Sequence, residues 1–381
     1  MVLFNRPYIS GKELQYILEA HASGVLAGDG QFTKRCNLWL EQTVGVQAAM
    51  LTHSCTAALE MAAILADIQP NDEIIMPSYT FVSTANAFVL RGGVPVFVDI
   101  RPDTLNLNEN LIESAISPKT KAVVPVHYAG VGCEMATILD VARQHGLIVI
   151  EDAAQGLLST YRGRELGGMG TFGTLSFHET KNVISGEGGA LLVNDLKYVR
   201  RAEIIRDKGT NRARFFRGEI DKYTWEDLGS SFLPGEIVAA FLWAQLQDAR
   251  AITEKRRVIW NYYYCAFETL ENEGFVRRPH VPDDCGHNAH MFYLLLDPKM
   301  RRDVILEHLN ERGIQTPFHY VPLHSSPAGT RFGRTSGAMD VTNKVSEQLI
   351  RLPMWIGMDQ SKQDIVIDSV RSIIRHTSVL Y

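Results

Sequence analysis

A lysine and an aspartate in separate segments of this chain have the surroundings of a covalent cofactor site. Lys181 lies in Ser-Phe-His-Glu-Thr-Lys-Asn at residues 176–182, and Gly-Glu-Gly-Gly follows at 186–189. Asp152 stands upstream, at the end of a predicted strand. A lysine amine can form a Schiff base with the aldehyde of pyridoxal phosphate, and a carboxylate can keep the pyridine nitrogen protonated. A lone lysine is usually a solvated surface residue, so the interpretation depends on both segments together.

Size and composition limit the classes of protein. The chain has 381 residues, of which 45% are hydrophobic and 21% charged, as in a globular protein with a large core. Its net charge of −5 argues against a nucleic acid partner. The N-terminus breaks too early for a secretory signal, and no apolar run is long enough for a membrane span. The five cysteines are widely spread without a Cys-x-x-Cys pair, so we expect no metal site and a reducing cytoplasm.

Short apolar runs alternate with amphipathic stretches between about residues 48 and 194. The predicted strands are Ala48–Leu51, Glu73–Met76, Pro95–Asp99, Ala122–Val126, Leu147–Glu151 and Ala190–Val193. The predicted helices are Thr56–Ala66, Ser83–Leu90, Glu109–Ile116 and Met135–His145. Repeated strand-then-helix units predict a mostly parallel α/β sheet with both faces covered. Ligands of such sheets bind beyond the carboxyl ends of the strands, where Asp152 is expected to lie.

The rest of the chain has a different pattern. A long helical stretch at about Glu236–Leu270 is expected to link two domains. Three elements follow it: the apolar run Met291–Leu296 and helices near Asp303–Glu311 and Gln363–Ile374. These predict a smaller α+β domain at residues 250–381, after a large cofactor-binding domain with an N-terminal helix at residues 1–249.

Two turns that follow predicted strands are candidates for cofactor contacts. Ser54-Cys55-Thr56 opens a helix, so its backbone N–H groups and the helix dipole can hold a phosphate. The alternative is an ordinary N-capped helix, and Cys55 as a nucleophile has no obvious base partner. Tyr79 or Phe81 can cover the face of the pyridine ring, and the alternative is a pair of core aromatics.

Three further patterns have plainer interpretations. Gly-x-Gly-x-x-Gly at 168–173 runs into an apparent strand instead of opening a helix, so it is read as a connection and not as a dinucleotide site. His319 and His324 flank a proline without a nearby acid, which favours a cleft loop over a metal site. The basic stretch from Arg200 to Arg217 is either a solvated face or, around Lys208–Arg212, a contact for a diphosphate.

Over nearly its whole length the chain resembles the DegT/DnrJ/EryC1/StrS sugar aminotransferases of fold type I. The resemblance is carried by residues 28–33, 54–59, 76–81, 126–128, 151–155, 176–182, 187–189 and 319–320. Residues 176–182 and 215–225 are most similar to the branch that makes dTDP-4-amino-4,6-dideoxygalactose, a precursor of enterobacterial common antigen in cell-surface polysaccharide synthesis.

The resemblance implies an aspartate aminotransferase-like fold and a role for each matching residue. Lys181 would form the Schiff base and move the proton, Asp152 would hold the pyridinium nitrogen, and Gln155 would contact the ring hydroxyl. Phosphate contacts would come from Cys55, Thr56 and Ser176, and Phe81 would stack on the ring. The predicted substrate contacts are Asn211, Arg212, His319 and Tyr320.

The resemblance also implies a homodimer with shared active sites. Many relatives contact the partner's phosphate through an asparagine in a Gly-x-Asn segment, whereas this chain has Gly229-Ser230-Ser231. A contact from Ser231 is therefore shorter, water-mediated or absent. Some relatives carry histidine in place of the reactive lysine and act as sugar dehydratases, so Lys181 favours transamination.

The expected reaction transfers the amino group of L-glutamate to C4 of dTDP-4-dehydro-6-deoxy-D-glucose. The product would be dTDP-4-amino-4,6-dideoxy-D-galactose. One alternative keeps the chemistry but gives the gluco epimer or uses another nucleotide sugar. Another is a regulatory protein that binds pyridoxal phosphate without turnover.

Overall fold

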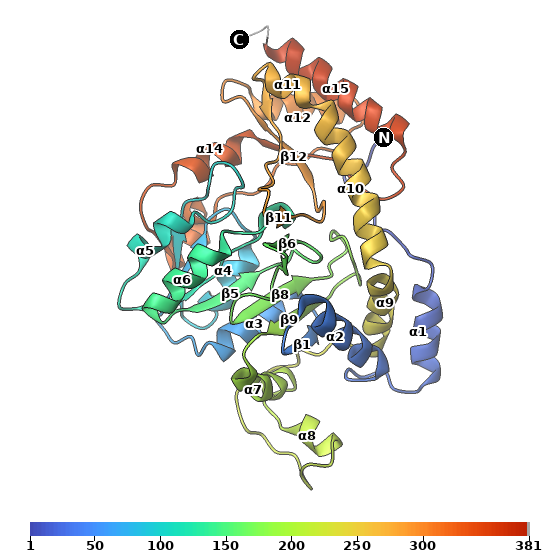
Figure 1. The fold of residues 1–381 in the computed structure, drawn as a ribbon, viewed down its shortest axis with the longest axis vertical. Coiled ribbons are helices and arrows are strands. Elements are labelled where there is room, and N and C mark those ends of the chain that lie inside the picture. The colour runs from blue at the N-terminus through green and yellow to red at the C-terminus, as the bar shows by residue number, and fades with distance from the viewer. Residues whose placement is uncertain (379–381) are drawn as a thin grey trace.

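The computed structural model describes residues 1–378. Its largest sheet has the strand order β1-β9-β8-β5-β4-β2-β3-β13 (Figure 1). These strands are β1 (Ala48–Thr52), β2 (Glu73–Pro77), β3 (Val94–Val98), β4 (Thr120–Val123), β5 (Ile148–Asp152), β8 (Phe172–Ser176), β9 (Gly189–Val193) and β13 (Arg334–Thr335). β9 pairs antiparallel with β1 and β8, and the other neighbours pair in parallel. The predicted mostly parallel sheet is confirmed.

Side chains alternate between two cores, one on each face of this sheet. On β1, Ala49 and Leu51 join one core, and Ala48 and Met50 join the other. The first core includes residues of α2 (Gln31–Val44), α6 (Met135–His145) and α9 (Glu236–Gln247). The second core includes residues of α3 (Cys55–Leu65), α4 (Val82–Val89) and α7 (Leu196–Arg206). Successive strand residues point to opposite faces, so the result is a three-layer α/β arrangement.

The C-terminal part has its own sheet and core. β10 (Val276–Arg277), β12 (Phe292–Leu296) and β14 (Leu349–Leu352) pair antiparallel in that order. They pack with α11 (Glu268–Asn272), α12 (Arg302–Glu311) and α15 (Gln360–Ser378). This smaller α+β unit beside the large sheet confirms the predicted fold class. A further small sheet joins β11 (Cys285–Gly286), β6 (Thr160–Tyr161) and β7 (Arg164–Glu165).

The helix α10 (Ala249–Ala266) connects the two cores. Ala249 and Ile252 pack into the first core of the large sheet, and Ile259, Trp260 and Tyr263 pack into the C-terminal core. Figure 1 shows α10 running from α9 toward the C-terminal elements. The division at residues 249 and 250 stays a prediction. The predicted helical stretch at about residues 236–270 is helical and is divided into α9, α10 and α11 at Asp248 and Phe267.

The remaining helices are α1 (Glu13–Ala22), α5 (Ile112–Ala115), α8 (Arg212–Phe216), α13 (Pro327–Phe332) and α14 (Asp340–Gln348). Short 3₁₀ turns occur at Glu109–Leu111, Tyr128–Gly130 and Leu323–Ser325. Figure 1 shows α8 projecting from the body of the protein beyond α7. Between residues 1 and 378, no helix combines the length and apolarity required to cross a bilayer.

Candidate active site

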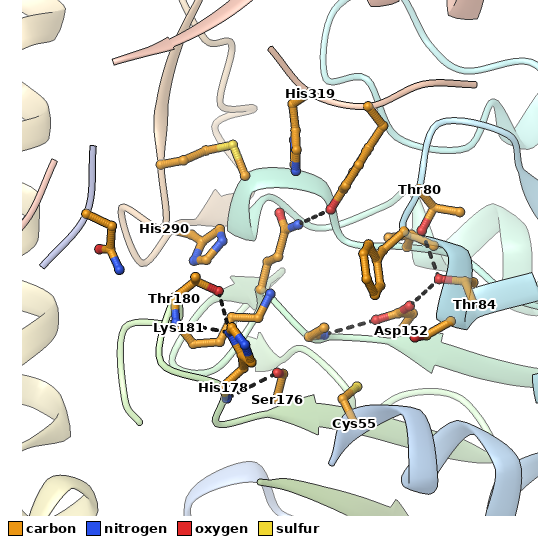
Figure 2. Close-up of a pocket in the computed structure, with 18 of the residues that line it drawn as sticks. Cys55, Thr80, Thr84, Asp152, Ser176, His178, Thr180, Lys181, His290 and His319 are labelled. Carbon is orange, nitrogen blue, oxygen red and sulfur yellow. Dashed lines mark hydrogen bonds between the residues drawn. The ribbon is translucent and has the colours of Figure 1, made fainter. Parts of the chain in front are cut away.

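A cavity of about 860 Å³ opens at the carboxyl ends of the central strands. Its walls include Phe81 after β2, Asp152 at the end of β5 and Ser176 at the end of β8. The C-terminal part contributes Tyr320 and, from β14, Arg351. Figure 2 shows Asp152 and Ser176 of the large sheet and His319 of the C-terminal part around one space. The cavity therefore lies where ligands of parallel sheets bind.

Both carboxylate oxygens of Asp152 are held by hydrogen bonds. The Thr84 hydroxyl donates to Oδ2 at 2.7 Å, and the Ala154 N–H donates to Oδ1 at 3.1 Å. The Thr84 hydroxyl also lies 2.8 Å from the Thr80 hydroxyl (Figure 2). Since Thr84 has one proton and gives it to the carboxylate, Thr80 donates to Thr84. Asp152 thus has one fixed orientation at the cavity wall.

The neighbouring Glu151 points to the opposite side of β5 and anchors the glycine-rich loop. It is fully buried and accepts hydrogen bonds from His127 Nε2 at 2.9 Å and from three backbone N–H groups of residues 167–170. Burial raises the pKa of Glu151, but these hydrogen bonds outweigh it and hold the pKa below its usual value. The Gly-x-Gly-x-x-Gly segment therefore wraps a protein carboxylate before it enters β8.

Lys181 lies in the connection between β8 and β9 and lines the cavity beside Asp152. Its N–H donates to the His178 carbonyl at 2.9 Å, and the Phe177 N–H donates to the Gly188 carbonyl at 2.8 Å. Burial lowers the pKa of the Lys181 amine, the positive charge of Arg351 adds to that effect, and Asp152 opposes it. A larger share of this amine is therefore neutral, and so nucleophilic, than in a solvated lysine.

The N-terminus of α3 forms a cradle for an anion. Ser54 caps this 11-residue helix, because its hydroxyl accepts from the Ala57 N–H at 3.0 Å. The Cys55 and Thr56 N–H groups, which precede that of Ala57 in the first turn, are available to an anion. A Cβ on Gly189 of β9 would lie 2.4 Å from the Cys55 nitrogen, so glycine allows β9 to pass this close. Burial raises the pKa of the Cys55 thiol far above its usual value, which argues against a nucleophilic Cys55.

Other predicted cofactor residues line the same cavity. Phe81 is 58% exposed, as suits a side chain that covers a planar ligand, whereas Tyr79 is buried among Tyr128 and Tyr320. Gln155 donates to the Tyr320 hydroxyl at 3.1 Å. Thr56, whose hydroxyl lies 2.7 Å from that of Ser83, and Ser176 also line it. An amine, a carboxylate, hydroxyls and a helix N-terminus in one cavity form a donor set that fits pyridoxal phosphate.

The predicted substrate residues divide into two groups. His319 and Tyr320 line the cavity, and His319 Nδ1 is hydrogen-bonded to the Tyr128 hydroxyl at 2.9 Å. Burial lowers the pKa of His319 well below its usual value, so its ring is neutral near pH 7. His324 Nδ1 is hydrogen-bonded to the Ser78 hydroxyl at 2.8 Å. In the described part of the chain, no three metal-ligating side chains gather.

Asn211, Arg212 and Ser231 are absent from the walls of this cavity. The Asn211 side chain bonds to Glu226 at 2.5 Å and to the Thr224 N–H at 2.8 Å, which closes the base of the segment 211–226. Arg212 lies 4.9 Å from the ring of Phe216 and 3.7 Å from Asp207. Ser231 is exposed and pairs with Asp207 through the backbone. Their contacts with a ligand or with a partner's cavity stay predictions.

Sequence reasoning missed three of the residues that complete the cavity: Thr84, Arg256 and Arg351. Thr84 is in the first turn of α4, four positions after Thr80, and the two hydroxyls lie 2.8 Å apart. Arg351 is a charged residue in the otherwise apolar Leu-Ile-Arg-Leu strand. A charge in a buried strand is a usable signal, because such a residue needs a partner or a function.

The family model described as the DegT/DnrJ/EryC1/StrS aminotransferase family matches residues 7–371. A spore coat polysaccharide biosynthesis protein, SpsC of Bacillus subtilis, is 33% identical over 98% of this chain and 97% of the relative. The GDP-perosamine synthase of Caulobacter vibrioides is 30% identical over 97% of each chain. The crystal structure of the aminotransferase TlmJ from Streptoalloteichus hindustanus superimposes with a TM-score of 0.91 at 28% identity, covering 99% of this chain and 100% of that chain.

The matches extend along the whole fold and include the segments that carry Asp152 and Lys181. They also confirm the fold type I architecture that the sequence predicted. The chain therefore belongs to the DegT/DnrJ/EryC1/StrS aminotransferase family and is a pyridoxal-phosphate-dependent nucleotide-sugar aminotransferase of that family.

Proposed function

We propose that this enzyme transfers the amino group of L-glutamate to C4 of dTDP-4-dehydro-6-deoxy-D-glucose, giving dTDP-4-amino-4,6-dideoxy-D-galactose for cell-surface polysaccharide. The observation that supports transamination is that Lys181 and Asp152 line one cavity, with Asp152 held by two hydrogen bonds. The name of the relative GDP-perosamine synthase supports a nucleotide-linked sugar. The particular sugar rests on the resemblance at residues 176–182 and 215–225.

When bound, pyridoxal phosphate supplies an aldehyde that condenses with amines and a ring that withdraws electrons from the reacting carbon. Asp152, fixed by Thr84 and the Ala154 N–H, would hold the ring nitrogen in its protonated form. Thr56, Ser176 and the first turn of α3 would bind the phosphate. Gln155 would contact the ring hydroxyl, and Phe81 would cover one face of the ring.

Lys181 would carry the proton that is removed from the donor and returned to the acceptor. Its amine approaches the cavity from the β8–β9 connection, so it delivers a proton from one side. The face of the hexose turned toward Lys181 therefore decides the configuration at C4. We propose the galacto product, with an axial amine, on the resemblance stated above.

We further propose a homodimer in the cytoplasm whose active sites each use residues of both chains. The segment 207–231 exposes large aromatic side chains, including Phe216 at 68% and Trp225 at 79%. An apolar surface of this kind is typical of a protein interface. In this arrangement Asn211, Arg212 and Ser231 would reach the partner's cavity, and Arg212 would face the nucleotide diphosphate.

Activity measurements on mixed dimers test the shared sites. Lys181→Ala and Arg212→Ala proteins are mixed under conditions in which heterodimers form. Some heterodimer cavities then contain both wild-type residues, so activity above either parent supports sharing. Heterodimers without recovered activity count against it. With the Arg212→Ala homodimer, the KM for the nucleotide sugar should rise much more than the KM for glutamate.

A panel of nucleotide 4-keto sugars, offered with glutamate, tests the reaction itself. Loss of the cofactor's yellow colour on adding glutamate, with release of 2-oxoglutarate, distinguishes an aminotransferase from a regulatory protein that only binds the cofactor. Small H3–H4 and H4–H5 couplings in the product's NMR spectrum identify the axial amine. Large couplings identify the gluco epimer and contradict the proposed product.

A further inference from the structure

Arg351 is a cation at the cavity wall on a strand that is otherwise apolar. It belongs to β14, whose other members, Leu349, Ile350 and Leu352, are at most 1% exposed. Its position pairs with Tyr293 of β12, in the centre of the C-terminal sheet. A guanidinium remains charged at neutral pH, so this wall carries a positive charge.

The hydrogen-bonding capacity of Arg351 is only partly used. Nη2 donates to the Phe318 carbonyl at 3.1 Å, and the guanidinium carbon lies 4.7 Å from the centre of the Phe4 ring. Nε is buried and has no hydrogen-bond partner within residues 1–378. No carboxylate of these residues forms an ion pair with Arg351. A buried donor of this kind is unfavourable unless a ligand satisfies it.

The other cationic groups of the cavity are already engaged or neutral. Arg256 donates from Nε to the Ala289 carbonyl at 3.0 Å and from Nη2 to the His290 carbonyl at 2.6 Å, so it positions that loop. Burial lowers the pKa values of His290 and His319 well below their usual range, which leaves both rings neutral near pH 7. Among the described residues, Arg351 is thus the cavity arginine that has a buried donor without an acceptor.

We infer that Arg351 binds the α-carboxylate of the amino-acid donor and thereby selects α-amino acids for the first half-reaction. This inference rests on the proposed transamination. An α-carboxylate is bonded directly to the carbon that carries the amine, so it arrives beside the reactive Lys181. The diphosphate of a nucleotide sugar is attached at C1, across the ring from the reacting C4. The planar fork of arginine also matches the two oxygens of a carboxylate.

Three donors that differ in one group test this assignment: L-glutamate, its γ-amide L-glutamine and its α-amide L-isoglutamine. The donor half-reaction is followed by the absorbance of the bound cofactor. In the wild type, isoglutamine should react far more slowly than glutamine. Arg351→Gln should lose roughly 10–100-fold in kcat/KM with glutamate, as expected for one charged hydrogen-bonding partner. It should lose much less with isoglutamine, because the group that Arg351 binds is already missing.

A binding measurement gives the answer without catalysis. Glutarate, which carries carboxylates but no amine, is titrated into the holoenzyme by calorimetry. Wild type should bind it at least roughly 10-fold more tightly than Arg351→Gln, and Arg351→Lys should recover part of the affinity. Arg331→Gln, a change on the surface of α13, serves as the matched control and should behave as wild type.

Three results would overturn the inference: equal glutarate affinity in wild type and Arg351→Gln, no glutarate binding in the wild type, or an equal loss with glutamate and isoglutamine. A variant that weakens only the nucleotide-sugar half-reaction would also overturn it. Failure of the proposed function looks different, because wild-type enzyme would then keep its colour with glutamate. Melting temperature and cofactor absorbance confirm that each variant folds.

Discussion

The two walls of the cavity differ in how completely their polar groups are satisfied. On the wall formed by the large sheet, Thr84 and the Ala154 N–H hold Asp152. Behind that wall, four hydrogen bonds hold Glu151. On the C-terminal wall, Arg351 has a buried donor for which residues 1–378 provide no acceptor. A carboxylate that is fixed before binding suits a cofactor that stays, and a buried open donor suits substrates that alternate.

Of the changes to the two walls, replacing the reactive lysine is expected to cause the largest loss of activity. Lys181→Ala removes both the covalent link and the proton carrier, so turnover should fall by about 10⁴-fold or more. Steady-state rates measure the loss, and circular dichroism confirms the fold. Residual activity of a few per cent of wild type would show that another group carries the proton.

Asp152→Asn removes the negative charge from the large-sheet wall without changing the shape of the side chain. A neutral amide cannot keep the ring nitrogen protonated, so the glutamate half-reaction should slow by on the order of 100-fold while the cofactor remains bound. Stopped-flow absorbance measures the rate. Asp368→Asn on the exposed face of α15 is the matched control. Equal rates in Asp152→Asn and wild type would remove Asp152 from the mechanism.

Thr84→Val tests whether Asp152 depends on the pair of hydroxyls, from Thr80 and Thr84, that lies behind it. The change keeps the side-chain shape, removes the donor to Asp152 and leaves the Thr80 hydroxyl without its acceptor. A hydrogen bond to a charged group contributes about 1.5–3 kcal/mol, so the donor half-reaction should slow by about 10-fold or more. Thr84→Ser should recover most of the rate. A valine variant as fast as the serine variant would make the Thr80–Thr84 pair dispensable.

The smallest expected effect is a shift in the pKa of Lys181 when the charge of Arg351 on the opposite wall is removed. Burial lowers the pKa of the Lys181 amine, and the charge of Arg351 lowers it further. Arg351→Gln removes that charge and favours the protonated amine, so the pKa of Lys181 should rise. The rate of cofactor uptake by the apo-enzyme, measured against pH, should then have its midpoint at a higher pH. A midpoint that stays at the wild-type pH, or moves to a lower pH, contradicts this coupling.

Local patterns in the sequence were sufficient for the elements that carry the cofactor residues. The predicted helix Met135–His145 has the bounds observed for α6, and the predicted strand at 147–151 lies within one residue of β5. The turn after β8 was recognised because its residue types are themselves specific. Such features depend on neighbours in the chain, which a pattern can show.

The contacts that tune the site could not be predicted in the same way. Thr84 and Asp152 are 68 positions apart, and Asn182 bonds to the Asn288 carbonyl across 106 positions. Such pairs depend on how whole elements pack. The bond from the Asn211 side chain to Glu226 also spans 15 positions, and the ligand contact of Asn211 stays a prediction.

Lys181 lies in the connection between two antiparallel strands, β8 and β9, and this restricts where residues can be added to the enzyme. Parallel strands need long crossovers that tolerate inserted residues, but β8 and β9 are joined by only the residues between Ser176 and Gly189. That connection is tied by backbone hydrogen bonds from Phe177 to Gly188, from Glu179 to Gly186 and from Ser185 to Phe177. The reactive amine therefore belongs to a short connection that is held by three backbone hydrogen bonds. We expect one residue added beside Lys181 to move the amine out of reach of its cofactor.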